Sequence, residues 1–374
     1  MTIASTGPEK KHSVQGRTTP FLKRPLSLDV RFFIAAAVAL LYLIGVNFPG
    51  VILSEKWLID ASKIEELAER GIAADNSFGV TAALFAIIPR SLLNLILYAF
   101  AVSFSVVWAL RLRVFWHFVL FAFVVVPVLF LCLVAPTKDF IVVVVSSLIA
   151  FLCRKSKPKT FIIIASLIYF AYASEVRVYY YLIPVVWVGL IYFVSLRKLS
   201  TKIILALLAI GALWLVPFEI LQGLQSPRDM AHAYGNLIGS NNRSSFSNPF
   251  PPGTPINFLG NYAYAFLQFN LPLLFARTPA EIFMNLCQVV IWSSIFVSFR
   301  AINSGALRPV AAAKAKLLIL LFLSHVLVLY LFNPDLGTHL RHLSSASVYL
   351  FSALWFLEWK ANADTNLRNS RRSL

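Results

Sequence analysis

Charged residues are scarce in this sequence. Asp, Glu, Lys and Arg together make up 13% of its 374 residues, against about 25% in a typical soluble domain. Hydrophobic residues account for 59%, and many of them lie in long apolar runs. This composition excludes a soluble globular protein. It predicts an all-α polytopic integral membrane protein, because each run is close to the length that a helix needs to cross a bilayer.

Cysteine is also rare, which excludes some kinds of site. Cys132, Cys153 and Cys287 lie within or at the ends of apolar segments, and none belongs to a CxxC motif or has a histidine partner. A zinc centre or a disulfide framework is therefore not expected, and we predict no metal and no cofactor. The net charge of +17 would suggest nucleic acid in a soluble domain. Here the basic residues flank apolar segments, where they face lipid head groups, so no nucleic-acid partner is expected.

Acidic residues are nearly missing from one side of the predicted membrane. We interpret the sequence as about ten spans, with residue 1 in the cytoplasm. The cytoplasmic side then holds 23 of the 33 Lys and Arg residues but only 4 of the 16 acidic residues. The outer side holds the other 10 basic and 12 acidic residues. The net charges of the two sides are +19 and −2, which add to the +17 of the whole chain. Cytoplasmic loops retain Lys and Arg, so this bias predicts that both termini are cytoplasmic.

The predicted domain layout is a basic cytoplasmic tail at 1–29, a transmembrane domain at 30–360 and a second tail at 361–374. The ten spans are expected near 31–48, 91–110, 114–134, 140–153, 160–174, 178–196, 202–218, 280–299, 317–333 and 343–359.

Four shorter features lie between or within these spans. A short surface helix is expected at 59–73. The Pro- and Gly-rich region 219–260 predicts a large outer loop without one long helix, and 261–275 predicts a re-entrant or interfacial segment. Spans 140–153 and 160–174 are too short to cross easily. They suggest an inner hairpin whose outer end lies low in the membrane.

Ionisable residues gather in three short clusters at the predicted outer boundary. Such groups are costly at membrane depth and usually mark a site. Arg offers a planar fork for phosphate and Lys a point charge for the same anion. Helical spacing would place Glu175 with Tyr179 on one face and make His339 diverge from Arg341. The clusters are Lys138-Asp139, Glu175-x-Arg177-x-Tyr179-Tyr180-Tyr181 and Asp335-x-Gly337-x-His339-x-Arg341-His342.

Structural roles are open for the same residues. Basic and aromatic residues at helix ends are ordinary membrane anchors, and Asp139 could cap the helix that follows it. The loop residues Arg228, Asp229 and Arg243 could be solvated charges. His325, inside a predicted span, is expected to pack against a neighbouring helix.

With these motifs the sequence resembles the Wzy-type polysaccharide polymerases of bacteria, also called O-antigen repeat-unit polymerases. They are GT-C-like membrane glycosyltransferases that join lipid-linked oligosaccharide units. The resemblance covers 114–200 and 315–360, about a third of the chain. It departs from the family at Arg243 and Gly253, whose separation is one residue off the pattern that some members carry. It is carried by Pro136-x-Lys138-Asp139, Arg177-x-Tyr179-Tyr180 and Gly337-x-x-x-Arg341-His342.

The resemblance implies polymerisation of undecaprenyl-pyrophosphate-linked repeat units into an exopolysaccharide, capsule or O-antigen. It places the protein in the bacterial cytoplasmic (inner) membrane, with its active face outward. The expected partners are the lipid-linked substrate, membrane lipids, and the flippase and chain-length regulator of the same pathway. No metal is required if protein cations neutralise the leaving diphosphate.

Each candidate residue then has an expected role. The residues expected to bind the pyrophosphate are Lys138, Arg177, His339, Arg341 and His342. The candidates for the catalytic base are Asp139, Glu175 and Asp229. The residues expected to bind glycan are Tyr179, Tyr180, Arg243 and Tyr262.

Other functions stay open at this stage. A glycosyltransferase that uses a polyprenyl-phosphate sugar would place paired acids in its first outer loop, where Glu65-Glu66 lie in a predicted amphipathic helix. A flippase or transporter would carry charges in mid-membrane and broken helices, yet the cores of the spans near 31–48, 114–134, 202–218 and 317–333 hold no acid or base. A ligase for finished glycan, or an accessory scaffold in polymer export, also fits the sequence.

Overall fold

The computed structural model describes residues 25–48, 55–71, 77–237, 244–271, 278–304 and 307–372, with the backbone alone for 55–58 and 357–372. This part of the chain is built from helices and contains no β-strand. The predicted all-α class is therefore confirmed for the described residues.

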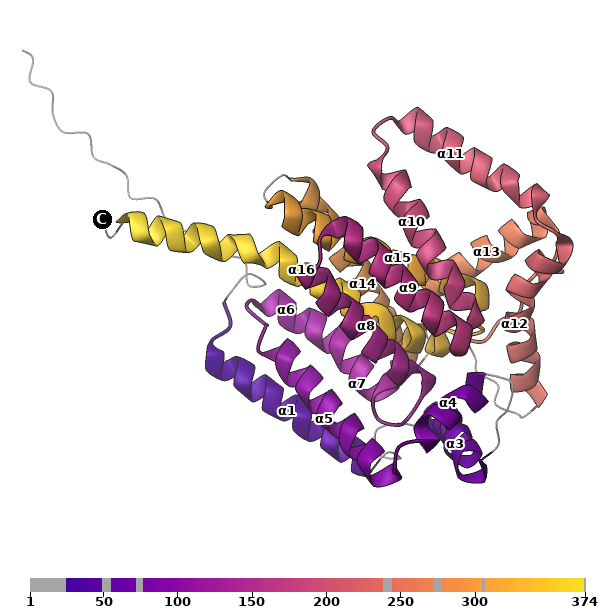
Figure 1. Cartoon of the computed structure of the whole chain (residues 1–374), viewed down its shortest axis with the longest axis horizontal. Helices are drawn as coiled ribbons and strands as arrows, with labels where there is room; N and C mark the ends of the chain where they lie inside the picture. Colours follow the sequence, from indigo (N-terminus) through magenta and orange to yellow (C-terminus); the bar gives the residue numbers. More distant parts are fainter. Residues whose placement is uncertain are drawn as a thin grey trace, which may run out of the picture.

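The first half of the chain forms a series of antiparallel helices and two smaller amphipathic or apolar ones (Figure 1). In chain order they are α1 (Leu28–Asn47), α3 (Glu55–Arg70), α4 (Ser77–Ala86), α5 (Arg90–Ala109), α6 (Phe115–Leu120), the π-helix η2 (Phe121–Val125), α7 (Val126–Cys132), α8 (Lys138–Lys155) and α9 (Pro158–Glu175).

The second half adds longer helices and two single turns of 3₁₀ helix. They are η3 (Val178–Tyr181), α10 (Leu182–Ser195), α11 (Leu199–Ala212), η4 (Leu213–Leu215), α12 (Phe218–Leu237), α13 (Pro255–Asn270), α14 (Pro279–Asn303), α15 (Pro309–Phe332) and α16 (Leu336–Arg372).

Among the described residues, six helical stretches are long and apolar enough to cross a membrane, or seven if the bent pair α11–η4 and α12 counts as one. The six are 28–47, 90–109, 115–132, 178–195, 279–303 and 309–332. The protein is thus a multi-pass membrane protein. Its innermost helix is α15, because 78% of its apolar window is buried and it packs against α16 and α10.

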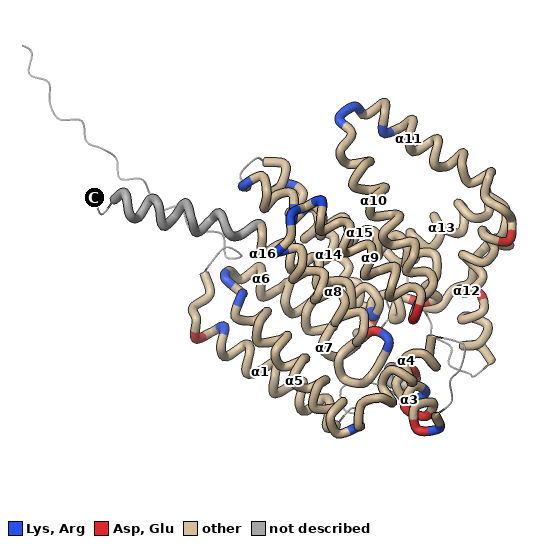
Figure 2. Tube along the Cα trace, viewed as in Figure 1, with Lys and Arg blue, Asp and Glu red and all other residues tan. Residues whose placement is uncertain are grey.

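The two ends of the bundle carry different charges (Figure 2). The turns after α5, α8 and α10 and the start of α15 carry Lys and Arg, and we call this the basic end. Contacts tie its turns together: Lys314 Nζ donates to the Arg154 carbonyl at 2.8 Å, and the Leu26 amide donates to the Arg113 carbonyl at 2.8 Å. The opposite end, which we call the mixed-charge end, holds α3, α4 and the start of α8.

The region predicted as the loop 219–260 is partly helical, so that prediction was wrong. Residues 218–237 form α12 although Pro227 lies inside it. The chain breaks instead at residues 216–217, where α12 turns by 99° from the preceding helix. Leu221, Gln225 and Arg228 are buried. Their spacing gives α12 a face that packs on the bundle, which offsets the cost of the proline.

Two more expectations about helix length need correction. Helices α8 and α9 have 18 residues each, about 27 Å of rise, so they are not the short hairpin predicted. The reason is that Thr137 caps α8 by accepting from the Phe140 amide at 3.2 Å, and Pro158 opens α9. Helix α13 also begins early, at Pro255, after the Thr254 cap, while 272–277 lie outside the described residues.

Candidate functional site

Three segments that are far apart in the sequence meet at the mixed-charge end. Asp139 lies on the first turn of α8, Arg177 lies between α9 and η3, and Arg341 lies near the start of α16. Arg177 Nη2 donates to Asp139 Oδ1 at 2.8 Å, and Arg341 Nε lies 3.0 Å from Asp139 Oδ2. Both carboxylate oxygens are thus engaged by guanidinium groups. Asp139 and Arg177 are almost fully buried, so the group forms one buried ionic cluster.

Local sequence places Arg341 in this cluster. Asp335 accepts from the Thr338 amide at 2.8 Å and from the Thr338 hydroxyl at 2.7 Å, which starts α16 before Gly337. Residues 337–342 are therefore helical despite the glycine. The expected divergence of His339 from Arg341 is confirmed, because His339 stacks on Phe269 with ring centroids 4.2 Å apart.

Arg177 reaches the cluster because it is not helical. Helix α9 ends at Glu175, and Arg177 has an extended backbone with φ −140° and ψ 94°. The predicted helical pairing of Glu175 with Tyr179 was therefore wrong. Arg177 Nη1 also donates to the Tyr180 hydroxyl at 3.3 Å. Burial acts to lower the pKa of Arg177, but Tyr179 and Asp139 together hold that pKa well above its ordinary value.

Asn333 connects the two histidines of the third motif. Its Oδ1 lies 2.8 Å from His342 Nδ1, and its Nδ2 lies 3.0 Å from His339 Nδ1. The amide oxygen accepts, so His342 Nδ1 carries the proton in this arrangement. His342 Nε2 is then a proton acceptor in the neutral ring, and it lies 3.7 Å from Asp139 Oδ1. His339, fully buried behind Asn333, is kept away from the cluster.

Sequence reasoning missed Asp60, which completes the cluster. Its Oδ2 lies 2.6 Å from Arg341 Nη2, so Arg341 bridges two carboxylates. Asp60 lies in the segment 59–73 that was predicted as a short surface helix, and it was not singled out as a site residue. The signal that could have placed it inward is the burial pattern of that helix, because Ala61 and Ile64 follow it at positions that face the core.

Lys138 lies beside the cluster and contacts α4. Its Nζ donates to Ser77 Oγ at 3.3 Å and lies 3.3 Å from the centroid of the Phe78 ring. It is only half-buried. The expected alternative of Asp139 as the helix cap was wrong, because Thr137 fills that role.

A cavity of about 650 Å³ opens beside the cluster. This is within the range of small-molecule sites. Arg177 and His342 supply its polar wall together with Asn333 and Thr338. Tyr179 also lines it and stacks on Phe332 with ring centroids 4.5 Å apart. The rest of the wall is mainly apolar and comes from Val176, Val178, Leu182, Leu224 and Pro227. The cavity therefore joins a polar edge, which carries the Arg177 guanidinium, to an apolar surface.

The predicted base candidates lie in different surroundings. Glu175 is exposed at the end of α9 and accepts from Ser174 at 3.3 Å. Asp229 accepts from the Asn248 amide at 2.7 Å and from its side chain at 3.0 Å, so it orders the segment after α12. Of the three candidates, the structure brings Asp139 alone into contact with the predicted phosphate-binding residues.

The predicted glycan-binding residues also lie at different places in the structure. Tyr179 faces the cavity, whereas Tyr180 is buried behind Arg177. Tyr262 packs on α15 and donates from its hydroxyl to the Leu327 carbonyl at 3.0 Å. Arg243 lies outside the described residues.

Arg228 is a buried structural arginine rather than a solvated loop charge. Its side chain donates to the Asn333 carbonyl at 3.1 Å, to Asn248 Oδ1 at 2.8 Å and to the Tyr330 carbonyl. These contacts fasten α12 to the turn between α15 and α16. His325 is buried as expected, and its Nε2 lies 2.5 Å from the Tyr169 hydroxyl.

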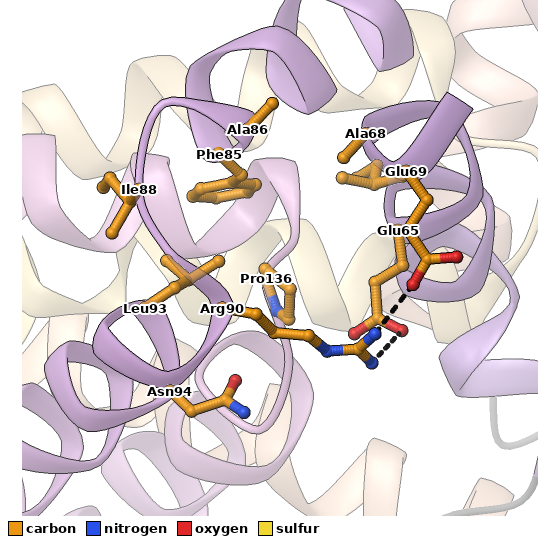
Figure 3. A pocket seen from close by; sticks show the side chains of 11 residues that line it. Glu65, Ala68, Glu69, Phe85, Ala86, Ile88, Arg90, Leu93, Asn94 and Pro136 are labelled. Carbon is orange, nitrogen blue, oxygen red and sulfur yellow. Dashed lines mark hydrogen bonds and ion pairs between the residues drawn. The ribbon is translucent and has the colours of Figure 1, made fainter. Parts of the chain in front are cut away.

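The paired acids of the predicted first outer loop form surface ion pairs. Glu65 and Glu69 lie 3.1 and 2.8 Å from Arg90, beside a small apolar pocket of about 170 Å³ (Figure 3). Glu66 pairs with Arg70 at 2.8 Å, and both are exposed. This is the solvated face that the sequence predicted.

Within the described residues, no group of three or more His, Cys, Asp and Glu side chains is placed to hold a metal ion. No protein-family model, curated protein or solved structure matches the chain.

Proposed function

We propose that this protein is a membrane glycosyltransferase that polymerises lipid-linked oligosaccharide repeat units at the mixed-charge end of its helix bundle. One observation carries the proposal: Arg177, Arg341 and His342 converge on Asp139 at the edge of a cavity with apolar walls. These are the residues by which the sequence resembles the Wzy-type polymerases.

The charges of the cluster suit a diphosphate leaving group. Arg177 and Arg341 are two cations against the carboxylates Asp60 and Asp139. Lys138 beside them, whose pKa burial lowers to about 7, adds positive charge in its protonated form. Guanidinium groups bind phosphate oxygens through paired hydrogen bonds. Fixed cations also stabilise negative charge as it develops on a leaving group. In this proposal Asp60 and Asp139 hold the two arginines in place before substrate binds.

The transfer step conserves atoms and charge. The bond between the anomeric carbon of the donor glycan and its diphosphate oxygen breaks, and a bond forms from that carbon to a hydroxyl oxygen of the acceptor unit. The diphosphate leaves on its lipid carrier and keeps the bonding electrons. The acceptor proton passes to a base, and we assign this to His342 Nε2. Both Asp139 oxygens already face guanidinium groups, whereas Asn333 leaves His342 Nε2 free of a proton.

The distribution of charge supports an orientation. Ten helical passages with both termini in the cytoplasm would put the basic end inside, in line with retention of Lys and Arg there. The cavity would then open at the outer face. We place the protein in the cytoplasmic membrane of a bacterium, beside the flippase that delivers its substrate and a regulator of chain length.

The experiment that tests this function is to remove the protein and size the lipid-linked saccharides that remain. Single repeat units on the carrier, with long chains absent, would support the polymerase. Unchanged long chains would reject it. Units trapped on the cytoplasmic side would indicate a flippase. Normal long chains that stay on the carrier would indicate a ligase.

A further inference from the structure

A groove at the basic end, opposite the candidate site, has two arginines at its mouth. The cavity of about 240 Å³ lies between α5, α8 and α16. Arg111 follows α5 and Arg154 lies in the last turn of α8. Their guanidinium carbons lie 4.4 and 4.3 Å from the centroid of the Trp355 ring. One indole therefore supports both cations, which fixes them near each other.

These two guanidinium groups lack a carboxylate partner among the side chains that the structure describes. Further cations lie close by, because Arg154 also lines a cavity of about 410 Å³ with Lys155, Arg308 and Lys314. The pKa of Arg111 is lowered, first by burial and then by the charge of Arg154. The two like charges thus destabilise each other, and an anion bound near both would relieve this repulsion.

Apolar side chains continue from the arginines toward the middle of the bundle. Helix α5 contributes Phe100, Phe104 and Trp108 to the groove. These residues are spaced four apart in the sequence, so their rings form a row along one face of the helix. From Phe100 to Arg111 the helical rise is about 16 Å, roughly half of the ~30 Å hydrocarbon core. Phe151 of α8 is 55% exposed at the rim, so the groove opens sideways toward lipid. Its depth matches one leaflet.

We propose that this groove binds one anionic phospholipid of the leaflet at the basic end, with its phosphate on Arg111 and Arg154 and an acyl chain along Phe100 and Phe104. Basic pockets between membrane helices at the cytoplasmic side are suited to anionic head groups. The paired cations and the leaflet-length apolar row together select a lipid over a free phosphate ion. The site is independent of the glycosyl transfer proposed above.

Tryptophan quenching by brominated lipids tests this directly. The full-length protein is reconstituted in phosphatidylcholine vesicles that contain equal fractions of brominated phosphatidylglycerol or brominated phosphatidylcholine. Subtracting the emission of Trp355→Phe isolates the Trp355 signal. We expect phosphatidylglycerol to quench this signal at least twofold more, with a preference that falls as salt rises.

Variants decide whether the arginines cause the preference. Arg111→Gln/Arg154→Gln should remove it. Arg197→Gln/Lys198→Gln removes the same charge from an exposed turn at the same end and should retain it. If the first variant does not fold, Arg111→Lys/Arg154→Lys keeps the charges without the stacked guanidinium planes and should reduce the preference.

Three results would overturn the proposal. The first is equal quenching by the two lipids in the unmodified protein. The second is a preference that persists in Arg111→Gln/Arg154→Gln and is lost in Arg197→Gln/Lys198→Gln. The third is loss of the preference when inorganic phosphate replaces chloride at constant ionic strength, which would indicate a site for the free anion.

Discussion

Replacing Asp139 with asparagine removes the charge that holds the ionic cluster together. The side chain keeps its size, but Arg177 loses its 2.8 Å ion pair and Arg341 loses its 3.0 Å contact. Breaking a buried ion pair costs about 3–5 kcal/mol of unfolding free energy. We expect the lower end of this range, because Arg341 keeps Asp60 at 2.6 Å and Arg177 keeps the Tyr180 hydroxyl.

A double-mutant cycle measures the pair itself. Asp139→Asn, Arg177→Gln and the double variant are unfolded with denaturant in detergent micelles and followed by tryptophan fluorescence. Each single substitution leaves a buried charged partner uncompensated. The loss of unfolding free energy in the double variant should therefore be about 1–3 kcal/mol smaller than the sum of the two single losses.

The chain supplies a matched control for this cycle. Glu66 and Arg70 also have an N–O distance of 2.8 Å, but their side chains are 56% and 64% exposed. The coupling of Glu66→Gln with Arg70→Gln should be about 0.3–0.5 kcal/mol. Additive costs at Asp139 and Arg177, or equal coupling in the two cycles, would refute the reasoning that burial gives this ion pair its energy.

Three further predictions concern residues around the cluster. Asp60→Asn should lower polymer formation in isolated membranes roughly tenfold, because Arg341 loses a charge-assisted contact that positions it; unchanged rates would contradict this. Asn333→Ala should cut the rate of transfer by about 10–100-fold with the protein still folded, since His342 loses the partner that sets its proton position. Arg228→Gln should lower unfolding free energy by about 2–4 kcal/mol, measured by denaturant titration, and a smaller loss than that of an exposed Arg70→Gln would contradict its structural role.

Helix positions and the residues of the cluster could be predicted from the sequence to different extents. Apolar runs gave the ends of α1, α5, α8, α9 and α14 to within a few residues, because burial in lipid or in the bundle core demands that length. Helices α15 and α16 begin at Pro309 and Leu336, well before the predicted starts at 317 and 343. Helix α8 was underestimated, since Thr137 caps it before the apolar run begins. Helix α12 was missed because Pro227 suggested a break that in fact falls at residues 216–217.

The sequence analysis predicted Lys138, Arg177 and Arg341 at one membrane boundary, where cations are few, and the resemblance implied that they share a ligand; the structure brings them near one another. The details could not be predicted, since they depend on tertiary packing. Asp60 reaches Arg341 over 281 residues of sequence, and the pattern of its helix indicates the face that packs inward but not the partner that lies there. Likewise, Asn333 is one amide among many until α15 and α16 bring it between two histidines.

The central claim is that a buried guanidinium pair holds the lipid diphosphate during transfer. The most direct test sizes lipid-linked saccharides in cells that carry Arg177→Lys at normal protein levels, with Arg90→Lys as the control from an exposed ion pair at the same end. Lysine keeps the charge but loses the paired hydrogen bonds. We predict single repeat units on the carrier for Arg177→Lys and long chains for Arg90→Lys. Long chains from Arg177→Lys, equal to those of the control, would contradict the claim.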